Sequence, residues 1–518
     1  MAKTRQSWGS KLGIIMAVAG SAVGLGNFLR FPVQAAQNGG GAFMIPYFVS
    51  FLLLGIPLMW IEWTLGRFGG GFEHGTGPGI FQSMWKKNRF IKYFGVIGIF
   101  GPIVIFIYYT YIESWLLGYT FFSLTGKYSS ATTPEAMKSF LTGYQGLAKN
   151  EYFGGLGNAY TFFLLTFILN IIVVYYGIKG GIEKLSKIAM PVLLFFGILL
   201  AIRVLTLGTP DITKPDWNLK NGLGFLWNPD FSKLLCGKVW MAAAGQIFFT
   251  LSVGIGVILT YASYLKKQDD VVLSGLTAAT TNGFAEVILG GSIVIPAAFI
   301  FFGPENIIPI AQSGSFNLGF VTMPLIFGKI PFGIIFATLW FLLLFLAGIT
   351  SSVSLAQPAV AFLEDEFNLS RKESVGIFSV VCFVLCQPAI FFLGNGVVDE
   401  LDFWGGTFSL VLFGTIEAIL FSWVFGIDRA WDEMHIGADM KIPKFYKFII
   451  KYITPLFLIL ILVFWFVQEG IPVILMKNIS AENLNFVILT RIMLLGLFLF
   501  VAFLVKIAWN KSRIESPE

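Results

Sequence analysis

Charged residues are scarce in this chain of 518 residues: only 12% are Asp, Glu, Lys or Arg, about half the share found in soluble globular domains. Histidine and cysteine are scarcer still, with two and three residues. His74 and His435 lie far apart in the sequence, which argues against a histidine-based metal site. Cys236, Cys382 and Cys386 form no disulfide framework, because the last two are one helical turn apart.

The chain also lacks the motifs of common enzymes. It has no Walker A pattern and no polar region long enough for a nucleotide-binding domain, which disfavours an ATP-driven machine. No nucleophile stands in a recognisable arrangement with a base or a metal site, so we expect no enzymatic activity. The polar start MAKTRQSWGSK runs into a hydrophobic segment without the pattern of a signal peptide.

Long hydrophobic runs, by contrast, are abundant. Hydrophobic residues make up 56% of the chain and gather into runs of roughly 20 residues, the length that crosses a bilayer as a helix. We therefore predict an all-α polytopic membrane protein with about 12 transmembrane helices. The runs lie near residues 11–36, 42–66, 93–124, 160–178, 188–208, 239–264, 272–301, 333–362, 374–394, 397–425, 445–468 and 484–508.

The basic residues predict how the chain is oriented. If the N-terminus is cytoplasmic, roughly two-thirds of the Lys and Arg residues fall in cytoplasmic segments, as the positive-inside rule requires. We therefore expect a multi-pass protein of the cell inner (plasma) membrane with both termini in the cytoplasm. The net charge of +6 follows from this bias, so it gives no reason to propose a nucleic-acid partner. The lipid bilayer is the expected partner, and the oligomeric state stays open.

Residues 19–32, AGSAVGLGNFLRFP, contain features that cost stability in a membrane helix. On spacing alone, Gly20 and Gly24 match a helix-packing face. A packing face needs neither Asn27 nor Arg30, and an arginine in hydrocarbon costs about 2.5–3.5 kcal/mol. A helix interrupted around a polar cavity gives all four residues a purpose, because its freed carbonyls can hold a cation and its exposed amides an anion. We therefore predict a break in this helix.

A second glycine interruption, VGIG at residues 253–256, repeats VGLG at residues 23–26 five spans later. Because five is an odd number, the second half of the chain would enter the membrane with the opposite topology. Paired interruptions of this kind predict an inverted repeat with a binding site at mid-membrane. We divide the single predicted membrane domain, 1–518, into repeat one (11–208), repeat two (239–425) and peripheral helices (445–508).

Several longer motifs are similar to those of a known family. They are SAVGLGNFLRFP (21–32), GGGAFMIPY (39–47), IYYTYIESW (107–115), GQIFFTLSVGIG (245–256), SGLTAATTNGFAEVILGGS (274–292), LAGITSSVSLAQP (346–358) and DELDFWGGT (399–407). Nearly end to end, the chain closely resembles bacterial members of the neurotransmitter:sodium symporter family, the leucine transporter among them. The resemblance implies a 5+5 inverted repeat with broken helices 1 and 6, two peripheral helices, and sodium-coupled uptake of an amino acid or related amine.

The resemblance also implies two sodium sites with oxygen ligands, which suit a hard alkali cation. The site beside the substrate would use the Ala22 carbonyl, the Asn27 side chain, Thr250 and Asn282. The second site would use the carbonyls of Gly20, Val23 and Ala347 with the hydroxyls of Thr350 and Ser351.

A substrate pocket is implied in the same way. The substrate carboxylate would meet the Leu25 and Gly26 amides, the Tyr109 hydroxyl and the first sodium ion. The ammonium group would meet carbonyls of Ala22, Phe249 and Thr250, with help from Ser252. The substrate side chain would contact Ile105, Phe249, Ile255 and Leu355, with Ser351 on the same helix face as Leu355.

Two gates and an acidic residue complete the implied site. On the outside Arg30 would approach Asp402 while Phe249 and Tyr109 cover the substrate, and on the inside Arg5 would pair with Asp365. Chloride-dependent family members have a serine at the position of Glu286, so this carboxylate would replace the anion and make transport independent of chloride, with proton counter-transport as a further expectation. The other intramembrane carboxylates, Glu62, Glu113 and Glu417, are expected to be structural hydrogen-bonders.

The pocket departs from that of the leucine transporter at two positions. Ile255 stands where that protein has Phe, and Ile105 where it has Val. We therefore predict a small apolar amino acid as substrate, because the shape of the pocket changes more than its polarity; leucine, methionine and aromatic substrates all stay open. Alternatives are a symporter for another small amine or zwitterion, and a transporter-like sensor that binds an amino acid without moving it.

Overall fold

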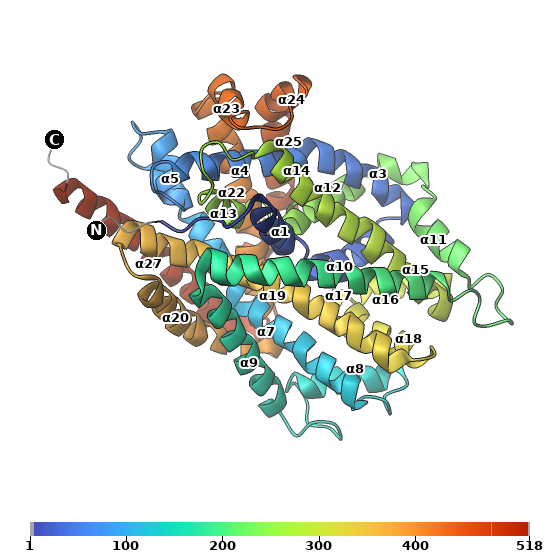
Figure 1. The fold of residues 1–518 in the computed structure, drawn as a ribbon. Coiled ribbons are helices and arrows are strands. Elements are labelled where there is room, and N and C mark those ends of the chain that lie inside the picture. The colour runs from blue at the N-terminus through green and yellow to red at the C-terminus, as the bar shows by residue number, and fades with distance from the viewer. Residues whose placement is uncertain (1–4, 478, 516–518) are drawn as a thin grey trace.

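The protein is described from a computed structural model that covers residues 5–477 and 479–515. In these residues the chain is helical, and its one isolated β-bridge joins Gly40 to Pro229 (Figure 1). The ends of the predicted domain, residues 1–4 and 516–518, lie outside the described residues.

The first half of the chain forms ten α-helices with three π-helical turns between them. The helices are α1 (Lys11–Ala22), α2 (Phe31–Gln37), α3 (Gly41–Ser50), α4 (Ile56–Gly70), α5 (Gly77–Met84), α6 (Ile91–Phe94), α7 (Ile97–Thr125), α8 (Pro134–Tyr144), α9 (Gly157–Tyr175) and α10 (Glu183–Leu205). The π-helical turns are η1 (Gly26–Arg30), η2 (Phe51–Gly55) and η3 (Ile178–Ile182).

The second half continues in the same style. Its α-helices are α11 (Leu219–Trp227), α12 (Gly237–Leu251), α13 (Val257–Ala262), α14 (Val272–Gly283), α15 (Gly291–Phe302), α16 (Pro304–Gln312), α17 (Ser315–Asn317), α18 (Met323–Gly328), α19 (Gly333–Phe367), α20 (Arg371–Phe391), α21 (Val397–Leu401) and α22 (Ser409–Ile419). Its π-helical turns are η5 (Phe284–Gly290), η6 (Leu318–Thr322), η8 (Asp402–Phe408) and η9 (Leu420–Val424), and its 3-10 turns are η4 (Phe231–Leu235) and η7 (Leu393–Asn395).

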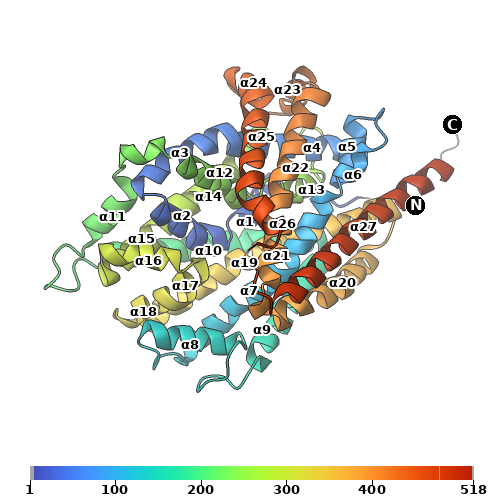
Figure 2. The ribbon, with the colours of Figure 1, turned by 180° about the vertical axis from the view of Figure 1, so that it is seen from behind.

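The last part contains α23 (Ile427–Met434), α24 (Phe445–Phe448), α25 (Thr454–Trp465), α26 (Ile471–Ile474) and α27 (Leu484–Glu515), with the π-helical turns η10 (Ile449–Ile453) and η11 (Phe466–Gly470). Figure 2 shows α25 and α27 on the outside of the bundle. The two ends of the described chain lie at the same end of the bundle in both views.

Within the described residues, ten helices are long and apolar enough to cross a membrane. The pair 11–22 and 26–37, bent by 44°, makes an eleventh span if it is counted as one. Helices α12 and α13 occupy the predicted run 239–264 and are separated by residues 252–256. The predicted all-helical, multi-pass fold class is therefore confirmed, with breaks in the two helices where the glycine pairs stand. The boundaries of the two repeats stay a prediction.

The first break follows from the residues around Gly24. Helix α1 ends at Ala22, and the amide freed at Gly24 donates to Asn27 Oδ1 over 2.9 Å. A Cβ atom at Gly26 would lie 2.8 Å from the ring of Phe249, so only glycine lets these two segments approach so closely. Asn27 thus replaces a helical partner that the broken backbone has lost.

The second break depends on left-handed backbone. Ser252, Gly254 and Gly256 have φ angles of 54°, 73° and 90°. The amide of Gly254 donates to a carboxylate oxygen of Glu62, which is fully buried on α4. Because membrane-spanning backbone must satisfy its polar groups internally, Glu62 acts as a cap for the unwound segment.

We expect Gly254→Ala to lower the melting temperature of the purified full-length protein. A side chain at this φ costs about 1–3 kcal/mol, and its Cβ would clash with the Leu410 carbonyl oxygen. Gly245→Ala is the matched control, because Gly245 lies in regular helix α12 with open space around it. Equal melting temperatures for the two variants would contradict this account of the break.

Candidate functional site

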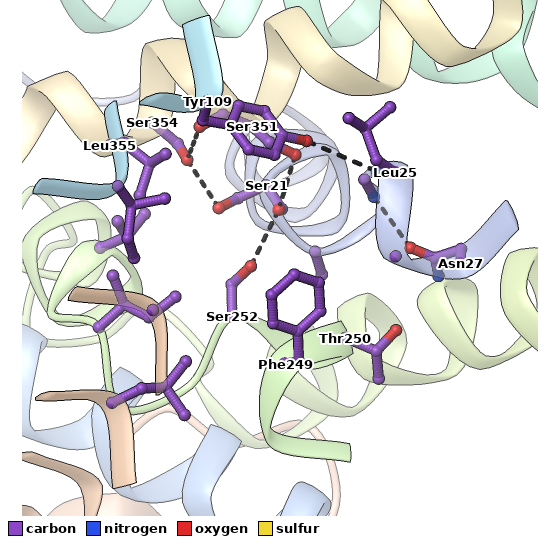
Figure 3. A pocket seen from close by; sticks show the side chains of 18 of the residues that line it. Ser21, Leu25, Asn27, Tyr109, Phe249, Thr250, Ser252, Ser351, Ser354 and Leu355 are labelled. Atoms are coloured by element: carbon purple, nitrogen blue, oxygen red, sulfur yellow. Dashed lines mark hydrogen bonds between the residues drawn. The ribbon is translucent and has the colours of Figure 1, made fainter. Parts of the chain in front are cut away.

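One pocket lies between the two broken helices. It has a volume of about 60 Å³ and is lined by segments of α1, η1, α7, α12, α13, α19, η8 and α22. Every residue predicted to bind substrate lines it: Ala22, Leu25, Gly26, Ile105, Tyr109, Phe249, Thr250, Ser252, Ile255, Ser351 and Leu355. Figure 3 shows the labelled side chains around this space.

The polar side of the pocket is formed by the broken backbone of α1. The Leu25 amide donates to the Tyr109 hydroxyl over 3.5 Å. The hydroxyls of Ser252 and Ser351 each donate to the Ser21 carbonyl over 3.0 Å (Figure 3). Hydrogen-bonding groups from three helices therefore converge where α1 is interrupted.

The opposite side is apolar and includes residues that the sequence analysis missed. Beyond Ile105, Ile255 and Leu355, the lining contains Val257 and Leu410. Val257 follows the second glycine pair directly, so its position was a usable signal. The further missed residues are Ser21, Gly24, Tyr108, Ser354 and Gly406.

The residues of the first predicted sodium site lie together. The Asn27 side chain contacts that of Asn282, with 2.8 Å between Nδ2 and Oδ1. The terminal amide atoms of Asn282 also lie 3.1 Å from the Ala22 carbonyl oxygen and 3.0 Å from Thr250 Oγ1. This set of carbonyl, amide and hydroxyl oxygens fits the ligand chemistry of an alkali cation.

The residues of the second predicted site are also neighbours. Ser351 Oγ lies 3.4 Å from the Gly20 carbonyl oxygen and 3.0 Å from that of Ala347. Thr350 Oγ1 lies 3.2 Å from the same Ala347 oxygen. Val23 directly follows the last residue of α1, so its carbonyl belongs to the non-helical segment. The hydroxyls and carbonyls of α19 thus face the last turn of α1.

Buried carboxylates surround the site. Glu286 is fully buried and accepts hydrogen bonds from Tyr47 and Gln246. Glu113 accepts from Asn170 over 3.2 Å, so it is the structural hydrogen-bonder that we expected, as is Glu62. That expectation is wrong for Glu417, whose two oxygens have no hydrogen-bond partner in the part of the chain that the structure describes.

At one end of the bundle a larger cavity of about 990 Å³ adjoins the pocket. Arg30 and Asp402 both line it, but the structure does not join them: within the described residues they form no ion pair. The Arg30 guanidinium instead lies 4.3 Å from the centre of the Phe249 ring, and Asp402 accepts a 2.6 Å hydrogen bond from Tyr108. Each partner is thus held by an aromatic residue across an open cavity, and their closer approach stays a prediction.

The end of the bundle that holds the N-terminus is closed. Arg5 forms an ion pair of 3.0 Å with Asp365 and donates to the Ser263 carbonyl over 2.9 Å. Trp8 donates to the Tyr261 carbonyl over 2.9 Å. These bonds tie the N-terminal segment to α13 and to the end of α19, whereas on its other side the pocket adjoins the large cavity.

Two interrupted helices around a pocket that is open at one end and closed at the other define a polytopic secondary transporter. The chain belongs to the sodium:neurotransmitter symporter family, whose model matches residues 5–140 and 128–511. Family membership implies sodium use and places the chain among transporters, not enzymes.

Relatives of known sequence and structure agree with this assignment. The chain is 32% identical to an uncharacterized sodium-dependent transporter of Methanocaldococcus jannaschii, over 88% of this chain and 89% of the relative. It is 26% identical to the sodium- and chloride-dependent glycine transporter 2 of Xenopus laevis, over 90% of this chain and 65% of that protein. The crystal structure of MhsT in complex with L-phenylalanine matches with a TM-score of 0.75 and 32% identity, covering 89% of this chain and 99% of MhsT.

The closed end generates a testable prediction. In a Cys236→Ser background with Ser263→Cys as reporter, Asp365→Ala should raise the labelling rate of the reporter by a thiol reagent roughly tenfold or more, since a charge-assisted bond contributes about 1.5–3 kcal/mol. Asp439→Ala is the control, because it breaks the exposed ion pair with Lys11 elsewhere on the chain. Equal labelling rates in the two variants would show that the Arg5–Asp365 pair does not close this end.

Proposed function

We propose that this protein is a sodium-coupled symporter that imports a small apolar amino acid by alternating access. The observation that carries the proposal is the two-sided pocket, with hydrogen-bonding backbone at one side and Ile105, Ile255 and Leu355 at the other. An amino acid has the same division between its charged backbone and its side chain. L-phenylalanine, with which the similar MhsT is in complex, is an apolar amino acid and supports the proposed class of substrate.

The proposed roles follow the lining of the pocket. The substrate carboxylate meets the amides of Leu25 and Gly26 at the start of a half-helix, where the dipole favours an anion, and the Tyr109 hydroxyl. The ammonium group meets carbonyls of Ala22, Phe249 and Thr250, beside Ser252. Phe249 lies between this pocket and the large cavity and closes over the bound substrate.

Two sodium ions are proposed as co-substrates, one at each of the two groups of oxygen ligands. Two ions and a zwitterion carry two net charges, worth about 4.6 kcal/mol at about 100 mV. A tenfold sodium gradient adds about 1.4 kcal/mol for each ion. The total of roughly 7 kcal/mol supports about a 10⁵-fold substrate gradient at full coupling.

Orientation completes the proposal. The positive-inside bias puts both termini in the cytoplasm of the cell, so the large cavity faces outward and the Arg5–Asp365 pair is the cytoplasmic gate. Arg30 and Asp402 form the outer gate, and they approach each other when the cavity closes. In alternating access, the outer end then closes and the cytoplasmic end opens, so that only one end is open at a time.

Uptake into proteoliposomes tests the function directly. Labelled amino acids are offered under an inward sodium gradient, with potassium replacing sodium as the control. We expect sodium-dependent accumulation of an apolar amino acid above the external concentration. Binding without accumulation would contradict transport and favour a sensor, while accumulation of amines or polar zwitterions alone would contradict the proposed substrate.

Glu286 generates a second prediction. Its buried carboxylate accepts hydrogen bonds from Tyr47 and Gln246. We propose that this carboxylate replaces a chloride ion, and that it is protonated when the empty transporter returns to the outward-facing form. Replacing chloride by gluconate should leave wild-type uptake unchanged, whereas Glu286→Ser should lose at least about tenfold in uptake without chloride and recover with it. Chloride-dependent uptake by the wild type would contradict this role.

A further inference from the structure

The imidazole of His74 is packed between three helices beside the closed end of the bundle. It lies in the connection 71–76 between α4 and α5, and its Nδ1 atom lies 2.8 Å from an oxygen of Glu366 on α19. Its ring stacks on that of Trp509 from α27, with the centres 5.8 Å apart and the planes 18° apart. On its other side the backbone of α5 is so close that a Cβ at Gly79 would clash with the imidazole. A histidine held on three sides in this way is a fixed contact between elements.

The same connection touches the Arg5–Asp365 pair. Gly75 follows His74 directly, and a Cβ atom there would lie 2.5 Å from Arg5 Nη2 and from Asp365 Oδ2. Glu366, the partner of His74, follows Asp365 on α19. The His74–Glu366 contact therefore holds the connection against the Arg5–Asp365 pair, with the backbone of Gly75 packed directly on both side chains.

The charges around His74 favour its protonated form. Burial alone lowers the pKa of His74, but the hydrogen bond and charge of Glu366, followed by the charge of Asp365, outweigh burial and the repulsion from Arg5. The pKa of His74 is therefore raised above its ordinary value of 6.5. A further cation, Lys92 of α6, lies over the Trp509 ring, 5.9 Å from its centre.

We propose that His74 is a positioning residue of the cytoplasmic gate: its proton holds the connection 71–76 on Glu366, so the gate is stabilised in its closed form in acid and released as the cytoplasm becomes alkaline. The proposal rests on the proposed gate and adds its regulation by pH. Release of substrate and sodium into the cell then becomes easier at alkaline pH.

The sign follows from proton linkage. The closed gate binds the His74 proton more tightly than an open gate, in which the imidazole faces water with its ordinary pKa of about 6.5. The added stability of the closed gate is complete below that value and is lost as pH rises through the raised pKa. Each unit by which the pKa is raised changes the ratio of closed to open gates tenfold.

The experiment uses the full-length protein with the Cys236→Ser and Ser263→Cys changes. Labelling rates are measured from about pH 5.5 to about pH 8.5 and divided by those of the same protein with His74→Gln, which cancels the pH dependence of the thiol itself. We expect a ratio near one in alkali that falls in acid. A ratio that is independent of pH would overturn the proposal.

Three variants sharpen the result. His74→Lys carries a permanent charge and should label slowly at every pH, and Glu366→Gln should move the wild-type transition to lower pH. His435→Gln is the matched control, since the chain has only two histidines and His435 bonds to Trp431 and Ile442 instead. A shifted transition in His435→Gln, or an unshifted one in Glu366→Gln, would contradict the assignment to His74.

The experiment distinguishes an error in the proposed gate from an error in the proposed role of the His74 proton. If Asp365→Ala does not raise labelling at any pH, the proposed gate is wrong, and the proposed role of His74 is wrong as well. If Asp365→Ala raises labelling while the ratio of wild type to His74→Gln stays flat, the gate stands and only the role of the His74 proton is refuted.

Discussion

The structure depends on one constraint: backbone groups that two helices release at mid-bundle must find partners inside the protein, because hydrocarbon offers none. Asn27 accepts from the Gly24 amide, and Glu62 accepts from that of Gly254. The Ser21 carbonyl accepts hydrogen bonds from the hydroxyls of Ser252 and Ser351. Helices α4, α7 and α19 therefore pack around the breaks as suppliers of hydrogen bonds, and the pocket is the space that remains between them.

For the proposed amino-acid substrate, this arrangement separates the groups that would recognise the backbone of any amino acid from those that would distinguish one side chain from another. The polar side is made largely of main-chain groups of residues 21–26, whose geometry the glycines and caps determine. The apolar side is made of exchangeable aliphatic side chains such as Ile105 and Ile255. A substitution there changes the shape of the pocket, and each methylene added or removed changes the discrimination between substrates by about 1–3 kcal/mol. The hydrogen-bond partners of the broken backbone stay the same.

The sequence predicted the features that local chemistry controls. The hydrophobic runs indicated the spans, and the paired glycines indicated both breaks. Gly254 and Gly256 adopt a positive φ, which glycine adopts without steric cost, and Gly26 allows the close approach of Phe249. The residues that the family resemblance assigned to the substrate pocket all line one pocket in the structure. The approach of Arg30 to Asp402 stays a prediction, because it depends on how far apart the helices around the large cavity stand. Leu410 was missed because its place in the pocket follows from the packing of α22.

The two ends of the bundle differ in their physical chemistry, one open and one closed, and this difference suits a cycle that must reverse. Aromatic and aliphatic side chains contribute much of the lining of the large cavity, and the Arg30 guanidinium lies over the Phe249 ring. At the N-terminal end, Asp365 is nearly buried and Arg5 satisfies it with a charge-assisted bond. A buried ion pair adds little net stability but makes any intermediate with one unpaired charge costly. Partly open forms of that end are therefore disfavoured relative to a closed or a fully hydrated form, which is the behaviour that the proposed gate requires.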